Sequence, residues 1–333
     1  MKKVLVTGAN GYIAKHIIAD LYKNKFSVIG TLRNIQKAKT VQSDIENHLG
    51  HKIDIAFKEV CLDSDEGWDD AVSGCDAIMH TASPFPIKYV KNEMDLINPA
   101  KEGTLRVMNA AKNNSIDRII VTSSNAAVYA GNKHITSFDE TMWSNIDSKN
   151  VRAYTKSKTV AEKAAWEFAK KNSSIVLTTI NPVLVWGPGI GDHSSSASLK
   201  IFDMLIKKAL PMVPKVKMPL VDVRDVSMAH VNALKLKNAE NQRFLICQGT
   251  YWFYDICKIL IEMNISAPNK QAPSFLIRFL SLFDKKLKEI TPFLDYNFEI
   301  KSDKAKKIID FNPIKLEKTL KDTKSYLSTL LKN

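Results

Sequence analysis

The chain has 333 residues, of which 45% are hydrophobic and 25% are charged, and this composition excludes disordered, collagen-like and disulfide-dense miniprotein classes. Its 48 basic residues exceed its 35 acidic residues, which gives a net charge of +13. The basic residues are dispersed among apolar ones and no nucleic-acid-binding motif accompanies them, so we expect solvated helix faces and no nucleic-acid partner.

The cysteine pattern and the amino terminus indicate a cytoplasmic protein. Cys61, Cys75, Cys247 and Cys257 have neither CxxC spacing nor nearby histidine pairs, so we expect free thiols in a reducing compartment and no metal site. The first apolar run covers only residues 4–6, and no window approaches 18 uncharged apolar residues. These observations favour a chain with no membrane partner.

The first half of the chain alternates short β-branched runs with longer helical patterns. Such alternation predicts βαβ units, and right-handed crossovers then require a doubly wound parallel sheet, the α/β Rossmann fold. The predicted strands are residues 3–7, 27–32, 53–57, 77–80, 118–122 and 175–180, and an amphipathic helix is predicted from about residue 12 to residue 23.

The pattern changes after residue 181, where Pro182, Gly187 and Pro188 interrupt it. Residues 244–247 resemble a returning strand, whereas residues 268–292 and the lysine-rich end indicate a smaller, mainly helical lobe. We therefore predict a cofactor-binding domain over residues 1–181, with returning segments near 219–248. A substrate-binding lobe is predicted over residues 182–218 and 249–333.

A glycine-rich turn lies between the first predicted strand and the first predicted helix and reads GxxGxxA from Gly8 to Ala14. Gly8 permits the tight turn, Gly11 lets the backbone approach a pyrophosphate, and Ala14 lets the helix pack on the strand. This position favours dinucleotide binding over an ordinary turn. The expected contacts come from Thr7, Gly8, Asn10, Gly11, Tyr12 and Ile13.

The end of the second predicted strand indicates which dinucleotide is bound. An acidic residue there reads the ribose of NAD, whereas an arginine reads the 2′-phosphate of NADP. This chain has Arg33 and no acid at that point, with Lys37 and Lys39 close behind. The sequence therefore predicts NADPH as the cofactor, held by Arg33 with the help of Lys39 or Lys37.

Two further segments indicate carbonyl chemistry. Tyr154 and Lys158 lie one turn apart on one face of a predicted helix, where an ammonium stabilises a phenolate and eases proton transfer. Ser123 and Ser124 end a predicted strand at the edge where ligands bind such sheets. Strand alternation sends their side chains in opposite directions, and counting back from Val128 favours Ser124 as the hydroxyl beside Tyr154.

Together, the glycine-rich turn, the serine pair, and Tyr154 with Lys158 resemble the extended short-chain dehydrogenase/reductase family. Four further segments, residues 80–84, 153–167, 181–188 and 221–226, look like its dihydroflavonol reductase and cinnamoyl-CoA reductase branch, which includes microbial NADPH-dependent aldehyde and ketone reductases. The resemblance extends over nearly the whole chain.

The resemblance implies a role for each matching residue. Ser124 would orient the substrate carbonyl, Tyr154 would donate the proton, and Lys158 would hold the nicotinamide ribose and lower the pKa of Tyr154. The other expected cofactor contacts are Asp63 at the adenine, Thr81 and Ala82 at the ribose side, and Pro182 and Val183 at the nicotinamide amide.

The function expected from the sequence is reduction of a small-molecule aldehyde or ketone by a monomer or homodimer, and neither the carbonyl substrate nor the direction is identified. A nucleotide-sugar epimerase or dehydratase, a hydroxysteroid-type dehydrogenase and a non-catalytic cofactor sensor remain alternatives on the same fold. Candidate pocket residues are Phe85, Pro86, Tyr129, Trp186 and the loop 194–198.

Overall fold

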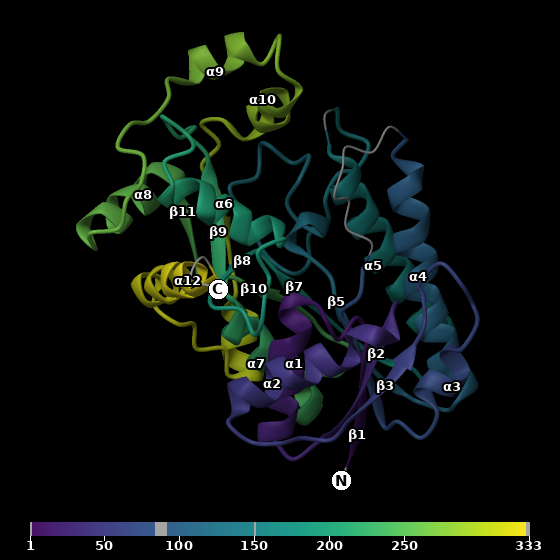
Figure 1. The fold of residues 1–333 in the computed structure, drawn as a ribbon. Helices are drawn as coiled ribbons and strands as arrows, with labels where there is room; N and C mark the ends of the chain where they lie inside the picture. The colour runs from purple at the N-terminus through teal and green to yellow at the C-terminus, as the bar shows by residue number, and fades with distance from the viewer. Residues whose placement is uncertain (1, 84–91, 150, 331–333) are drawn as a thin grey trace.

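The structure is a computed structural model that describes residues 2–83, 92–149 and 151–330. Its centre is a seven-stranded, entirely parallel sheet with the strand order β10-β7-β5-β4-β1-β2-β3 (Figure 1). The strands are β1 (Lys3–Val6), β2 (Ser27–Leu32), β3 (Ile55–Glu59), β4 (Ala77–His80), β5 (Arg118–Thr122), β7 (Val176–Pro182) and β10 (Arg243–Ile246).

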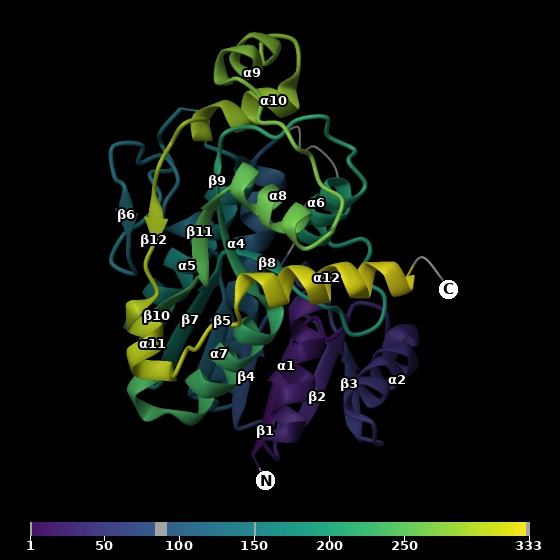
Figure 2. The same ribbon diagram turned by 90° about the vertical axis from the view of Figure 1, so that its left-hand side faces the viewer.

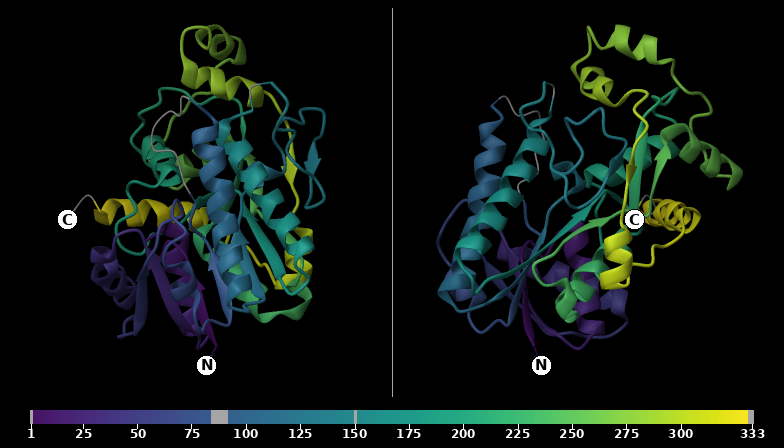
Figure 3. Two further views of the ribbon diagram at one scale, coloured as in Figure 1. Left: turned by 90° about the vertical axis from the view of Figure 1, so that its right-hand side faces the viewer. Right: turned by 180° about the vertical axis from the view of Figure 1, so that it is seen from behind.

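Helices cover both faces of this sheet, because side chains that alternate along each strand enter two different cores. Val4 and Val6 of β1 belong to one buried cluster, and Leu5 between them belongs to the other. The first cluster is closed by α1 (Tyr12–Lys23), α2 (Ala38–Leu49), α7 (Val223–Lys235) and α11 (Asp303–Ile309). The second is closed by α3 (Trp68–Val72), α4 (Met94–Asn113) and α5 (Ala153–Lys171) (Figure 3).

A second lobe surrounds a three-stranded sheet of β8 (Leu184–Trp186), β9 (Lys217–Asp222) and β11 (Gly249–Trp252). Its helices are α6 (Ala197–Ile206), α8 (Phe253–Glu262), α9 (Ser274–Leu280), α10 (Lys285–Ile290) and α12 (Leu316–Leu330). Two short strands, β6 (Ser137–Phe138) and β12 (Glu299–Ile300), pair beside the two sheets. In Figure 2, α12 crosses the molecule between α8 and α1.

The doubly wound parallel sheet predicted from the sequence is confirmed, and three strands have the predicted bounds. The strand predicted over residues 53–57 instead runs from Ile55 to Glu59, because its pairing with β2 continues to the contact of Leu32 with Glu59. The sheet of the second lobe was not predicted. Among the described residues, no helix is both long and apolar enough to cross a membrane.

The division into two domains remains a prediction. The segment that contains β12 and α11 contributes Ile300, Ala305, Ile309 and Phe311 to a buried cluster of the main sheet. The following helix α12 instead contributes Leu316, Leu320 and Leu327 to the core of the second lobe. The carboxy-terminal part of the chain therefore packs on both units.

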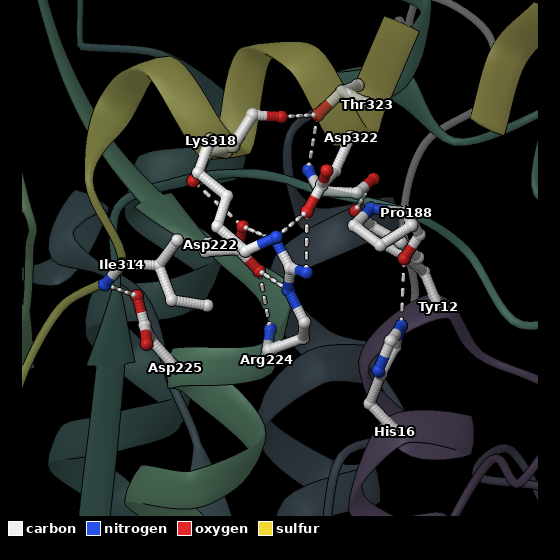
Figure 4. A network of polar contacts seen from close by, with 12 residues as sticks. Tyr12, His16, Pro188, Asp222, Arg224, Asp225, Ile314, Lys318, Asp322 and Thr323 are labelled. Atoms are coloured by element: carbon white, nitrogen blue, oxygen red, sulfur yellow. Dashed lines mark hydrogen bonds and ion pairs between the residues drawn. The ribbon is translucent and has the colours of Figure 1, made fainter. Parts of the chain in front are cut away.

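A network of charges around the buried Asp222 joins α12 to the start of α7 (Figure 4). Asp222 caps α7 by accepting the Arg224 N–H at 2.9 Å, and its carboxylate also binds the Arg224 guanidinium at 2.9 and 2.7 Å. Arg224 reaches Asp322 of α12 at 2.7 Å, and Thr319 donates its hydroxyl to Asp222 at 2.8 Å. Although burial disfavours the charge, the pKa of Arg224 is raised because both carboxylates pair with it.

Asp225, the residue of α7 that follows Arg224, has a buried carboxyl group. Its Oδ2 accepts the Ile314 N–H at 2.9 Å. Burial raises the pKa of Asp225 from its ordinary 3.8 to about 7, and the charge of Asp222 adds to the rise. An acid with a raised folded-state pKa contributes stability below its unfolded pKa, and this stability is lost as the pH rises through the folded value. Ionised Asp225 therefore destabilises the fold above pH 7.

We expect Asp225→Asn to increase the free energy of unfolding at pH 8, by at most about 4 kcal/mol, because each pKa unit corresponds to about 1.4 kcal/mol. At pH 4.5 the gain should be much smaller. Melting temperatures measured from pH 4.5 to pH 8 check this, and a gain that does not grow with pH contradicts it. Asp322→Asn is a control with the opposite expected sign. Partial burial raises the pKa of Asp322, but its ion pairs outweigh this effect and the pKa is lowered. The Asp322→Asn variant should therefore lose stability at pH 8.

Candidate active site and cofactor site

The glycine-rich turn joins β1 to α1, and at its two glycines an added Cβ would meet neighbouring atoms closely. Gly8 has a φ of +66°, and a Cβ there would lie 3.1 Å from the Cβ of Ala82. Gly11 is the residue that precedes α1, its N–H donates to the Gly8 carbonyl at 2.8 Å, and a Cβ there would lie 3.1 Å from the same oxygen. The first N–H groups of α1 therefore remain available to an anion, and the turn fits the pyrophosphate of a dinucleotide.

The hydroxyl of Thr7 connects this turn to the end of β4. It accepts the N–H groups of Thr81 and Ala82, each at 3.0 Å, and lies 2.9 Å from Nδ1 of His80. Burial, with a smaller effect from the charge of Lys158, lowers the pKa of His80 to about 3. The ring is therefore neutral, and because Thr7 already accepts two N–H groups, its own proton goes to Nδ1.

The second lobe braces the turn from the other side. The hydroxyl of Tyr12, the first residue of α1, donates to the Gly187 carbonyl at 2.7 Å. The Gly187 N–H donates in turn to the hydroxyl of Thr323 in α12 at 2.8 Å (Figure 4). Burial, together with the charge of Asp222, raises the pKa of Tyr12, so this hydroxyl stays a protonated donor.

The basic residues predicted to read the 2′-phosphate are exposed. Arg33 directly follows β2, Lys37 lies in a short 3-10 helix (Ile35–Lys37), and Lys39 lies in the first turn of α2. The carboxylate of Glu59, at the end of β3, accepts the Ile35 N–H at 3.2 Å. Glu59 therefore contacts the segment that carries Arg33 and Lys37. The sequence did not indicate Glu59, because Glu59 is 26 positions after Arg33. It comes close to the Arg33 segment only through the pairing of β2 with β3.

Ser124, Tyr154 and Lys158 come together at the carboxyl end of the sheet. Ser124 lies beside Tyr154 and acts to lower the pKa of its hydroxyl, and the Ser124 Oγ accepts the Ala126 N–H at 3.1 Å. The Lys158 Nζ lies 5.9 Å from the centre of the Tyr154 ring. Ser123 points the other way and donates its hydroxyl to Glu162 at 2.5 Å.

Burial controls the titration of both proposed catalytic groups. It raises the pKa of Tyr154, which the neighbouring Ser124 hydroxyl partly offsets. This direction is opposite to the lowering expected from Lys158. Burial also lowers the pKa of Lys158 to about 8, and the charge of Glu162 opposes that change. At neutral pH the phenol is therefore a neutral donor and the amine is mostly charged.

The segment after β7 lies beside this group. Asn181 donates its amide to the Ser124 carbonyl at 3.2 Å, and Pro182 ends the strand. Val183 follows, buried, with its N–H 3.3 Å from the Ile246 carbonyl. Pro182 and Val183 are thus brought to Ser124, whereas Asp63 is an exposed residue of the loop after β3.

Tyr129 and Arg152 line a pocket. Burial raises the pKa of Tyr129, and the charges of Arg152, which lowers it, and of Tyr154, which raises it, are further influences. Trp186 lies instead in the second-lobe core, 5.0 Å from the Phe202 ring between ring centres. Phe85 and Pro86 are outside the described residues. Other lining residues are Gly131, Lys133, Lys149, Thr155, Phe293 and Tyr296.

The comparisons with known proteins identify a family and similar reductases. Residues 4–247 match the NAD dependent epimerase/dehydratase family. The chain is 33% identical over 279 residues to the NADPH-dependent methylglyoxal reductase of Saccharomyces cerevisiae, covering 78% of this chain and 82% of that one. It is 31% identical over 327 residues to a cinnamoyl-CoA reductase of Medicago truncatula, covering 96% and 94%.

A solved structure is similar over almost the whole length. The crystal structure of the yeast methylglyoxal/isovaleraldehyde reductase complexed with NADPH superimposes with a TM-score of 0.80 at 27% identity, covering 99% of each chain. The motifs, the sheet and these matches lead to one assignment. The chain belongs to the NAD dependent epimerase/dehydratase family, the extended short-chain dehydrogenases/reductases that its motifs resemble.

Proposed function

We propose that this chain is an NADPH-dependent reductase that converts the carbonyl group of a small aldehyde or ketone to an alcohol. The observation that carries the proposal is that Tyr154 lies beside Ser124, whose hydroxyl acts to lower the pKa of Tyr154, and beside Lys158, whose Nζ is 5.9 Å from the centre of the same ring. Lys158 also lies within electrostatic reach of His80, which contacts Thr7 at the phosphate-binding turn. A proton donor, a carbonyl-orienting hydroxyl and a cation therefore adjoin the cofactor site.

NADPH, when bound, supplies the hydride. Gly8, Gly11 and the start of α1 would hold its pyrophosphate, and Arg33 with Lys37 or Lys39 would hold its 2′-phosphate. Relatives that are NADPH-dependent, or complexed with NADPH, support this choice of cofactor. The proposal keeps the remaining contacts at Thr7, Asn10, Tyr12, Ile13, Asp63, Thr81, Ala82, Pro182 and Val183.

The chain's own residues complete the reduction. As negative charge develops on the carbonyl oxygen, Tyr154 donates its proton to that oxygen and the Ser124 hydroxyl hydrogen-bonds it. The ammonium of Lys158 stabilises the phenolate that remains, and buried surroundings strengthen this attraction. A raised pKa for free Tyr154 favours the protonated form that the step requires.

The pocket beside Tyr129 supports an organic carbonyl compound as the substrate. The rings of Tyr129 and Phe293 lie 6.0 Å apart between centres, and Arg152 lies 5.8 Å from the Phe293 ring. Named relatives that reduce methylglyoxal or cinnamoyl-CoA support the same class. The enzyme is tested with NADPH against an aldehyde and ketone panel, and UDP-sugars in the same assay test the epimerase alternative. A monomer or homodimer remains a prediction.

Tyr154→Phe should lower turnover roughly 100- to 10,000-fold, because general acid catalysis is typically worth that much and only the donating oxygen is lost. NADPH affinity and melting temperature should stay close to those of the wild type. Loss of NADPH absorbance with the best carbonyl of the panel measures the rate. Tyr22→Phe, which removes a hydroxyl bonded to the Asp54 carbonyl, is the control. Wild-type turnover in Tyr154→Phe would remove the basis of the proposal.

NADPH should bind at least roughly tenfold more tightly than NADH, because a charged hydrogen bond to the 2′-phosphate contributes roughly 1.5 to 3 kcal/mol. Arg33→Ala should remove most of this preference and leave NADH affinity unchanged. Titrations of Lys37→Ala and Lys39→Ala identify the assisting lysine, and the exposed Lys307→Ala is the control. A preference that Arg33→Ala does not alter would contradict the assignment.

Ser124→Ala should lower the catalytic rate roughly ten- to a thousandfold with little change in NADPH affinity, by analogy with the loss of one oxyanion donor. Ser123→Ala should mainly cost stability, on the order of 1.5 to 3 kcal/mol, because it removes a buried hydrogen bond to a carboxylate. Turnover and thermal unfolding of both variants separate the two effects. The reverse pattern would assign the catalytic role to Ser123.

A further inference from the structure

A carboxylate is buried directly behind the proposed catalytic side chains. Glu162 lies on α5 four residues after Lys158, and its side chain is 0% exposed. It accepts the Ser123 hydroxyl at 2.5 Å and the Asn181 amide at 2.6 Å. Further donors are Thr179 at 3.2 Å, Trp166 at 3.4 Å and Arg243 at 2.5 Å. One carboxylate therefore joins α5 to the ends of β5 and β7.

The counter-charge of Arg243 is itself fixed in place. The guanidinium binds both carboxylate oxygens of Glu162, through Nε at 2.5 Å and Nη2 at 3.3 Å, and its carbon atom lies 3.8 Å from the centre of the Trp143 ring. Its remaining N–H groups donate to the backbone carbonyls of Ala127, Glu140 and Met142. All five N–H groups of the guanidinium are engaged, so the charge has one defined position.

The contacts of Glu162 orient the residues around Ser124, and they do more than stabilise the fold. A buried ion pair is weak evidence for stability, since apolar residues of similar volume often stabilise as well. Asn181 shows the constraint: its nitrogen donates to Glu162 and to the Ser124 carbonyl, and its Oδ1 is the one buried side-chain N or O atom in the described ranges that lacks a partner. The carboxylate thus orients this amide, and through it the backbone of Ser124.

The same carboxylate acts on the charge of Lys158. The titratable groups that face this ammonium are Tyr154 one turn before it, Glu162 one turn after it and neutral His80 from β4. Burial lowers the pKa of Lys158 to about 8, and Glu162 works against that lowering. Without the negative charge of Glu162, burial acts unopposed and favours the neutral amine.

We propose that Glu162 is a positioning residue of the reductase site, one that holds Ser124 toward Tyr154 and keeps Lys158 charged. This inference rests on the proposed function. The Glu162 side chain is fully buried and acts through Ser123, Asn181 and Lys158. Arg243 is its fixed counter-charge, paired with the Glu162 carboxylate at 2.5 Å.

The test is the pH profile of Glu162→Gln, which retains the shape of the side chain and loses its charge. In the wild type, turnover should fall as the pH rises through about 8, where Lys158 loses its proton. In Glu162→Gln the fall should begin about one pH unit lower or more. The ratio of wild-type to variant turnover should therefore grow between pH 6 and pH 8, reaching roughly fivefold or more at pH 8.

Glu162→Asp is the second variant, because it keeps the charge and withdraws it by one methylene group. In this variant, turnover should begin to fall at the same pH as in the wild type. Turnover itself should be several-fold lower at every pH, and KM should change less than kcat. If Glu162→Gln does not fold, the test rests on Glu162→Asp. A wild-type kcat in Glu162→Asp would then overturn the proposal.

Arg118→Gln is the structural control. Arg118 is a partly buried arginine at the opposite end of β5, with hydrogen bonds to the Val176 and Ala233 carbonyls at 3.0 and 2.7 Å. Arg118→Gln should lower the melting temperature without changing the pH at which turnover falls. A Glu162→Gln variant that behaves in the same way would reduce Glu162 to a structural role and overturn the proposal.

NADPH affinity as a function of pH supplies a readout that does not need turnover. Because Lys158 is proposed to hold the nicotinamide ribose, affinity should weaken above about pH 8 in the wild type and from a lower pH in Glu162→Gln. If the wild type reduces no carbonyl of the panel, the proposed function fails, whereas an active wild type with unshifted profiles in Glu162→Gln refutes the role of Glu162.

Discussion

Parallel pairing of the seven strands brings all their carboxyl ends to one edge of the sheet, and the site depends on this constraint. The glycine-rich turn after β1, the serines after β5 and the Pro182 segment after β7 are distant in sequence but adjoin at that edge. Hydrogen bonds between strand ends, from Thr81 to Thr7 and from Asn181 to Ser124, fix their relative positions. Helix α5 then adds Tyr154 and Lys158 from one face.

Two carboxylate–guanidinium groups, each with a fully buried carboxylate, hold the two sides of this arrangement. Glu162 and Arg243 lie behind the serines, and Asp222 and Arg224 lie where α7 meets the carboxy-terminal helix. In each group the arginine binds two carboxylate oxygens, so the geometry is fixed as well as the charge. The first group neighbours ionisable site residues, whereas the second joins separate parts of the chain.

Much of the main sheet was predictable because buried strands between helices produce compact β-branched runs. Strand β3 was displaced by two residues in the prediction, since it lies at the sheet edge and its pattern is only partly buried. The sheet of the second lobe escaped notice because β8 and β11 have three and four residues, and Pro219 interrupts the pattern of β9. Short strands carry too little periodicity to be recognised.

The candidate site was predictable to different degrees. Strand alternation predicts opposite directions for Ser123 and Ser124, and in the structure they contact Glu162 and Tyr154 respectively, although their catalytic roles remain predictions. Glu162 itself was not predicted. A glutamate four residues after a lysine in a charged helix is typical of an exposed ion pair, and only the tertiary contact with Arg243 reveals its burial.

The link from Tyr12 through Gly187 to Thr323 has a consequence for how the protein is made. Its three residues are separated by 175 and 136 positions, so the turn near the amino terminus receives its last support from a helix close to the other end of the chain. During synthesis, a ribosome-bound intermediate can form β1 and α1 early, but the Tyr12 hydroxyl gains this partner only after the second lobe has emerged. Cofactor-binding competence is therefore expected to arise late and cooperatively, only after the segment that contains Thr323 has been made.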